Sequence, residues 1–122
     1  MTSPLRVRVR NAFIQAGGKW PVNRSAAIPL GGAALQCKTL RQASLVCDVV
    51  RGNDPLMLRN AKLLVFLCQV AGMHEADKWI GSELIQAVKE ERRTKLIQGK
   101  LTYELTIDHP PRLIVLHIEE RP

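Results

Sequence analysis

Aromatic side chains are scarce in this chain, because Phe, Trp and Tyr together make up 4% of its 122 residues. Proteins that stack successive bases of single-stranded nucleic acid need several exposed rings, so the composition argues against that mode of binding. The core must instead be built mainly from Leu, Ile, Val and Ala. With 46% hydrophobic residues, the chain is long enough to bury such a core as one domain.

Cysteines are few, and their spacing suits neither cross-linking nor metal binding. The chain has Cys37, Cys47 and Cys68, an odd number without a CxxC pair. Disulfide frameworks and zinc sites require more thiols, or thiols that are closer in sequence. We therefore expect buried free thiols in a reducing compartment, and neither a metal nor a cofactor.

Long apolar runs are also missing. The longest, residues 63–68, is far shorter than the ~20 residues that span a bilayer. The amino-terminal segment alternates Arg with Val and lacks the apolar stretch of a secretory signal. These features predict an intracellular protein, cytoplasmic or nuclear. The Arg-rich, acid-free start leaves a mitochondrial location as the alternative.

Acidic residues are absent before Asp48. Beyond Cys47 the Lys and Arg residues equal the Asp and Glu residues in number, so the whole net charge of +7 lies in the first 47 residues. Such segregation creates a local positive field that attracts anionic partners. The cations of this segment are Arg6, Arg8, Arg10, Lys19, Arg24, Lys38 and Arg41.

The first segment alternates apolar and basic residues with a period of two. This pattern over residues 5–10 predicts a strand, with Leu5, Val7 and Val9 toward the core and three arginines on the other face. A helix is the alternative, because Leu5, Val9 and Phe13 recur at every fourth position. The Gly, Pro and Asn residues of the 17–32 segment predict a long irregular connection after it.

The middle of the chain contains one well-marked helix. Pro55 follows Asp54, a potential cap, and Gly72 can end a helix, so we predict a largely buried helix over residues 55–71. Weaker patterns before it predict a short helix over residues 33–41 and a strand over residues 44–50.

The second half predicts two more helices and a hairpin. A short helix is expected over residues 75–80, and a longer one, capped by Ser82, over residues 83–98. Alternating residues 101–107 and 112–119 predict two antiparallel strands joined by a turn.

The expected fold is therefore a single α+β domain over residues 1–122, in which a small antiparallel sheet packs against two or three helices. Its basic strand and loop (1–47) precede a remainder of helices and hairpin (48–122).

No motif in the sequence specifies a reaction. The Gly17-Gly18-Lys19 step lacks the upstream Gly and the Ser/Thr of a phosphate-binding P-loop. His74 and Asp77 share a helical face, but no second HxxH or HExxH adds metal ligands. We therefore predict a protein that is not an enzyme and has no small-molecule substrate.

Two basic groups remain as candidate binding residues. The first group lies in the amino-terminal segment, where no Asp or Glu occurs between its members. Its arginines suit phosphate because the planar guanidinium group can bind two oxygens at once. If the predicted first strand pairs beside Glu104 and Asp108, however, these arginines are neutralised. In the second group Glu90 and Glu91 lie between the cations in the sequence, and such a mixture of charges is typical of a solvated helix face. The first group is Arg6, Arg8, Arg10, Lys19 and Arg24; the second is Lys89, Arg92, Arg93 and Lys95.

These features favour a non-enzymatic protein that contacts the phosphate backbone of RNA or DNA through its amino-terminal region, with a scaffolding or self-assembly role and a possible homo-oligomer. One alternative is a peripheral membrane protein of the viral matrix or accessory type. In it the arginines meet anionic lipid, and Trp20, Ile28 and Leu30 provide the anchor. The other is a protein–protein interaction module.

Overall fold

The computed structural model describes residues 4–15, 27–29, 33–37, 39–48, 55–108 and 113–121. Within them the chain forms three helices and a six-stranded antiparallel sheet of order β1-β2-β3-β6-β5-β4. The predicted α+β fold is confirmed. The elements are α1 (Leu5–Gln15), β1 (Ala27–Pro29), β2 (Ala33–Gln36), β3 (Gln42–Asp48), α2 (Pro55–Ala71), α3 (Ala76–Glu90), β4 (Thr94–Gln98), β5 (Leu101–Asp108) and β6 (Leu113–Glu120).

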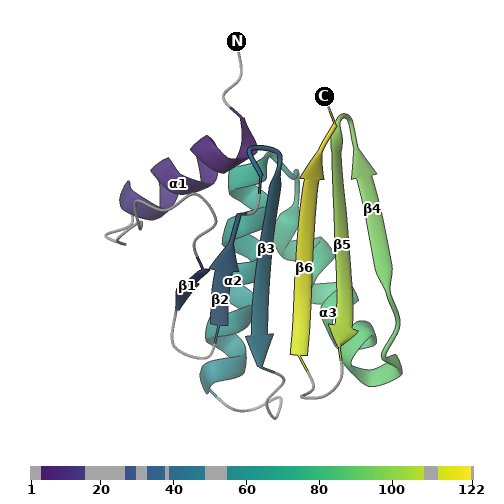
Figure 1. The fold of residues 1–122 in the computed structure, drawn as a ribbon. Helices are drawn as coiled ribbons and strands as arrows, with labels where there is room; N and C mark the ends of the chain where they lie inside the picture. Colours follow the sequence, from purple (N-terminus) through teal and green to yellow (C-terminus); the bar gives the residue numbers. More distant parts are fainter. Residues whose placement is uncertain are drawn as a thin grey trace.

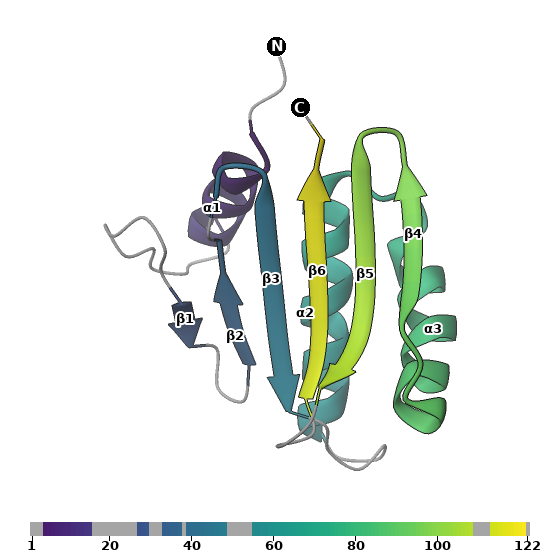
Figure 2. The same cartoon turned by 45° about the vertical axis from the view of Figure 1, so that its right-hand side comes forward.

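The described elements form two layers, with the helices on one face of the sheet (Figures 1 and 2). Alternate residues of each central strand point into the core between the layers, as the period of two requires. In β6 these are Ile114, Leu116 and Ile118, all fully buried. The intervening residues of the same strand lie on the opposite face of the sheet, where they are half-buried or exposed.

The strand prediction for residues 5–10 is wrong, because this segment is the first part of helix α1. Leu5 and Val9 are buried, and Phe13 packs against the core. Residues four apart lie on one side of a helix, so the same apolar residues that alternate along a strand also form a helical stripe. The Arg6 amide, which has no partner within the helix, donates to the Leu40 carbonyl at 3.0 Å and fixes α1 to the turn after β2.

The short helix predicted over residues 33–41 is also wrong. Residues 33–36 form β2, and Thr39–Arg41 form the turn that leads into β3. Ala33, Leu35 and Cys37 are buried in alternation, which is the pattern of a strand with one face on the core. The strand predicted over residues 44–50 is confirmed as β3, which begins two residues earlier; Val49 and Val50 lie outside the described residues.

The central helix is confirmed as α2. Gly72, at φ 111°, ends it in a conformation that favours glycine, and the amides of Gly72 and Met73 both donate to the Cys68 carbonyl. The proposed cap Asp54 lies outside the described residues. The helix is less buried than expected, because Leu58 is 62% exposed on its outer side.

The two helices predicted over residues 75–80 and 83–98 are wrong in their bounds. One helix, α3, runs through Ser82, whose hydroxyl donates to the Trp79 carbonyl instead of capping. It ends at Glu90, and the next residue, Glu91, adopts a left-handed φ of 53°. Residues 94–98 then form β4, an edge strand paired with β5 in which Lys95 lies opposite Glu104.

The carboxy-terminal hairpin is confirmed. Strands β5 and β6 pair along their whole length, from Leu101 opposite Glu120 to Asp108 opposite Leu113. The connecting turn lies outside the described residues. Both the start of α1 and the end of β6 lie at the same end of the molecule as the β2–β3 and β4–β5 turns (Figure 1).

Candidate functional site

The arginine row expected on one face of a strand is divided by the helix. Arg6 and Arg10 are four residues apart and lie on the same side of α1, whereas Arg8 projects to another side. Arg10 is exposed, and Arg6 is half-buried close to the turn after β2. The alternative, in which a first strand pairs these arginines with Glu104 and Asp108, therefore does not occur, because the segment is helical.

Arg8 is engaged within the protein. One nitrogen of its guanidinium lies 3.2 Å from Glu120 Oε2, and the other donates to the Ala71 carbonyl at 3.2 Å. The side chains of Arg8 and Glu120 are 19% and 18% exposed. This largely buried pair joins α1 to the end of β6 and the end of α2, so Arg8 holds the fold together and is not presented to a ligand.

Most of the remaining predicted site lies outside the described residues. Lys19 and Arg24, the other two members of the first basic group, fall there, as do Trp20 and Leu30 of the predicted anchor. Ile28 lies in β1, where it is paired in register with Leu35 of β2.

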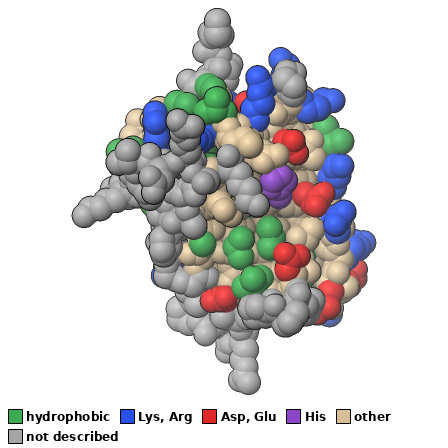
Figure 3. Space-filling model, viewed as in Figure 1, with side chains coloured by type: hydrophobic (Ala, Val, Ile, Leu, Met, Phe, Trp, Pro, Cys, Tyr) green, Lys and Arg blue, Asp and Glu red, His purple; other side chains and the backbone are tan. Residues whose placement is uncertain are grey.

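A basic cluster nevertheless forms at one end of the sheet from segments far apart in sequence. Arg41 lies in the β2–β3 turn, Lys100 in the β4–β5 turn, and Arg121 just after β6. Main-chain bonds hold these segments together, because the Glu120 amide donates to the Arg41 carbonyl and the Arg121 amide to the Lys100 carbonyl, both at 2.8 Å. All three side chains are exposed, and Lys and Arg side chains gather along the upper edge of the face in Figure 3.

Arg6 extends this cluster onto α1. Its amide bonds the Leu40 carbonyl, so it lies beside the turn that carries Arg41, and Arg10 follows one helical turn further on. We call Arg6, Arg41, Lys100 and Arg121 the basic end. Three of its four members lie outside the predicted site. Lys100 and Arg121 come from the half of the chain whose charges cancel, so charge counting along the sequence could not find them.

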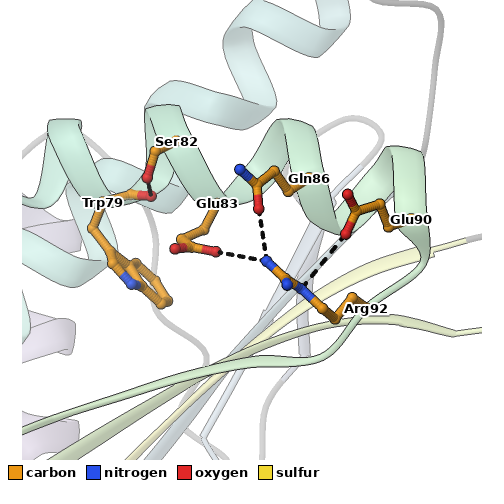
Figure 4. Close-up of polar contacts among 6 residues, drawn as sticks. All are labelled: Trp79, Ser82, Glu83, Gln86, Glu90 and Arg92. Atoms are coloured by element: carbon orange, nitrogen blue, oxygen red, sulfur yellow. Dashed lines mark hydrogen bonds and ion pairs between the residues drawn. The ribbon is translucent and has the colours of Figure 1, made fainter.

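Two members of the second basic group, Arg92 and Arg93, pair with carboxylates. Arg92 folds back along α3, where it donates to Gln86 Oε1 at 2.6 Å and lies 3.9 Å from Glu83 and 3.8 Å from Glu90 (Figure 4). Arg93 lies 3.6 Å from Glu104 of β5. Arg92 and Arg93 follow the helix and are not part of it, so the expected helix face does not include them.

The sheet face opposite the helices carries a polar pair that the sequence did not reveal. A 2.8 Å hydrogen bond joins Ser44 Oγ to His117 Nδ1, and His117 Nε2 lies 3.9 Å from Glu119. The pair borders a hollow of about 340 Å³. Ser44 and His117 are 73 residues apart and become neighbours only through the β3–β6 pairing.

This pair has the residue types of a Ser–His–carboxylate triad but lacks its supporting geometry. At 3.9 Å the carboxylate is beyond hydrogen-bonding distance from the ring. Ser44 lies in a regular strand that pairs on both sides, so the amides around it are engaged in the sheet. They are thus not directed at a developing oxyanion, as acyl transfer requires. We assign the pair to cross-strand stabilisation.

The cysteines are buried free thiols, as expected. Burial raises the pKa of Cys37 to about 11, with Arg6 opposing the rise, and raises the pKa of Cys47 and of Cys68 to about 12. Such thiols are protonated at neutral pH and are poor nucleophiles. In the part of the chain that the structure describes, no three His, Cys, Asp or Glu side chains gather in a way that could hold a metal ion.

Comparisons with protein-family models, with curated proteins and with solved structures yield no match to this chain. None of the helices within the described residues is both long enough and apolar enough to cross a bilayer.

Proposed function

We propose that this protein binds the phosphate backbone of nucleic acid, without catalysis, through the basic end. One observation carries the proposal: main-chain hydrogen bonds bring Arg6, Arg41, Lys100 and Arg121 to one end of the sheet from distant parts of the chain. Cations held at one surface produce a field that attracts a polyanion and releases its counterions on binding.

The chemistry of the basic end suits backbone contacts better than base recognition. Arginine and lysine contact phosphate oxygens whatever the base sequence. On the sheet face opposite the helices, the described residues include no aromatic side chain that could stack on bases; Tyr103 of β5 points into the core, where it is fully buried. Binding is therefore expected to be independent of sequence and sensitive to salt.

The test measures the affinity for generic RNA and duplex DNA by fluorescence anisotropy over a range of salt concentrations. With three to four phosphate contacts, the logarithm of the binding constant should fall with the logarithm of salt with a slope of roughly −3 on duplex DNA. Replacing Arg41, Lys100 and Arg121 together by Ala should reduce this slope to about −1 or less and weaken binding at low salt.

The matched control removes three exposed cations from the helices: Arg59→Ala, Lys78→Ala and Lys89→Ala. It changes the net charge by the same amount and should keep most of the salt slope. Equal losses in both triple variants would show that net charge alone drives binding, and would contradict the proposal. Absence of any binding by the unaltered protein would do the same.

A second candidate is attachment to an anionic membrane surface, which one observation favours. Leu40 lies in the turn beside Arg41 and is 53% exposed, so the basic end carries an apolar side chain among its cations. Such a combination suits the interface of an anionic bilayer. Co-sedimentation with phosphatidylserine vesicles, but not with neutral vesicles, is the result that this candidate requires.

A further inference from the structure

An apolar groove runs between α2 and α3 on the outer side of the helical layer. Its volume is about 670 Å³, and its floor contains Ile80 and Leu84, which are almost fully buried. Large apolar side chains on both walls face water: Leu58 is 62% exposed, Phe66 37% and Ile85 68%. Apolar surface gathered around a groove in this way is typical of an interaction site.

A glycine in the middle of α3 lies along the same groove. Gly81 has a φ outside the left-handed region, and a Cβ placed on it would meet no atom within 4 Å. Glycine in a helix interior costs roughly 0.5–1 kcal/mol relative to alanine, and nothing within the described protein requires it here. The space above Gly81 would allow close approach by a second backbone or a bulky side chain.

Two opposite charges also border the groove, Lys62 on α2 and Asp77 on α3. Both are exposed, and neither has an ion-pair partner among the described residues. The two helices are antiparallel, joined by the short segment after Gly72 (Figures 1 and 2). Asp77 is therefore close to the end of α2 at Ala71, and Lys62 lies roughly 13 Å further down that helix, at 1.5 Å per residue.

This arrangement is self-complementary. A twofold axis that lies in the plane of contact, perpendicular to the line from Lys62 to Asp77, places Lys62 of each copy over Asp77 of the other. A contact between two identical surfaces requires such a relation: if one residue of the first copy contacts a second residue of the other copy, the reverse contact also forms. The axis then passes over the middle of the groove, close to Gly81, where the missing side chain leaves room.

We infer that the α2–α3 groove is the interface of a homodimer, in which the helical layers of two copies face each other. The apolar walls of each groove cover those of the other, and two Lys62–Asp77 pairs flank the axis and set the orientation. The basic end lies at the end of the sheet and stays accessible in such a dimer. The inference does not rest on nucleic-acid binding.

The first test measures the oligomeric state by sedimentation equilibrium for the full chain and for Leu58→Asp and Ile85→Asp. Both side chains are mostly exposed, so the monomer should fold, which circular dichroism verifies. The unaltered chain should be dimeric at micromolar concentrations, and each variant should raise its dimer dissociation constant by more than about tenfold. A monomeric unaltered chain, or a dimer that both substitutions leave intact, overturns the inference.

A mixing experiment tests the orientation. In Lys62→Asp an acidic residue faces Asp77 of the second copy, and in Asp77→Lys two lysines face each other, so each variant alone should dimerise weakly. Mixed together, the two variants match at both positions and should form a heterodimer, detectable by native mass spectrometry. If either variant alone dimerises normally, or if mixing the two folded variants forms no heterodimer, the charge arrangement is refuted.

The glycine provides a readout that separates folding from association. In a Leu58→Asp background, Gly81→Ala should raise the thermal stability of the monomer, because alanine is the better helix former and meets no neighbour. In the unaltered background, Gly81→Leu should weaken dimerisation severalfold by filling the space at the axis. A dimer that tolerates leucine at this position contradicts the proposed contact.

Discussion

The guanidinium of Arg8 lies 3.2 Å from the carboxylate of Glu120, a residue 112 positions later in the chain. The contact holds the first helix, α1, against the end of the last strand, β6. The same guanidinium donates to the carbonyl of Ala71, at the end of α2. Three elements from the beginning, the middle and the end of the chain therefore meet at one largely buried side chain.

Replacing Arg8 should destabilise the protein substantially. Hydrogen bonds that involve charged groups contribute about 1.5–3 kcal/mol to stability. Removing Arg8 also leaves the Glu120 carboxylate without its positively charged partner. We expect Arg8→Ala to lower the free energy of unfolding by about 2 kcal/mol, a value already reduced for the partial exposure of the pair.

Chemical denaturation measures this change, and Arg10→Ala is the control. Arg10 is exposed on the same helix, and its replacement should change stability by less than about 0.5 kcal/mol. Equal effects of the two substitutions would show that the Arg8 contacts contribute little.

Removing one buried hydroxyl should stabilise the protein. Tyr103 is fully buried beside Trp79, and its hydroxyl has no hydrogen-bond partner among the described residues. An unsatisfied buried polar group costs about 1–3 kcal/mol. Tyr103→Phe keeps the ring and its packing, so it should raise the melting temperature by several degrees, measured by calorimetry. A lower melting temperature would show that the hydroxyl is satisfied.

The extent to which the sequence predicts this fold depends on how local each signal is. The bounds of α2 were predictable because Pro55 and Gly72 determine where the helix begins and ends through local backbone effects, which extend over about one helical turn. The state of residues 5–10 was not, because Leu5 and Val9 satisfy a strand and a helix equally well, and the choice depends on packing. Strand β4 was missed because Glu91 leaves the helix at a positive φ, for which glutamate gives no sequence signal.

The candidate site was predicted still less well, for a related reason. The sequence shows the excess of positive charge before Asp48, but the positions of these cations in space depend on the tertiary fold. Arg8, expected to be free, is engaged with Glu120. Lys100 and Arg121, which the sequence places in a segment of balanced charge, lie at the same end of the sheet as Arg41, because main-chain bonds join the end of β6 to the turns on both sides of it.

Alkaline pH should destabilise the protein through its buried thiols and Tyr103. Burial raises the pKa of Cys47 and Cys68 to about 12 from an ordinary 9.0, and that of Tyr103 to about 12 from 10.0. A raised pKa in the folded state means that the unfolded chain loses these protons first. The stability contribution is therefore complete well below pH 9, the ordinary pKa of the thiols, and declines as the pH rises through that value toward 12.

Thermal unfolding measured from pH 7 to pH 11 tests this dependence. The melting temperature should be nearly constant up to about pH 8 and then fall, with each thiol contributing up to about 1.4 kcal/mol per pH unit. Cys68→Ala should make the alkaline decline shallower, whatever its effect at neutral pH. An unchanged decline in this variant would show that other groups cause it.

A substitution at Leu40 distinguishes between the two candidate functions of the basic end. Its main-chain carbonyl holds the Arg6 amide, whereas its side chain is 53% exposed, so Leu40→Ser should leave the cations in place and the protein folded. If the partner is nucleic acid, phosphate contacts supply the affinity, and the substitution should change RNA binding by less than about twofold. If the partner is an anionic membrane, loss of an apolar side chain inserted at the interface should weaken vesicle binding about tenfold, since each buried methylene contributes about 0.8 kcal/mol. Strongly reduced RNA binding by Leu40→Ser would contradict the phosphate-backbone proposal, because no cation has been removed.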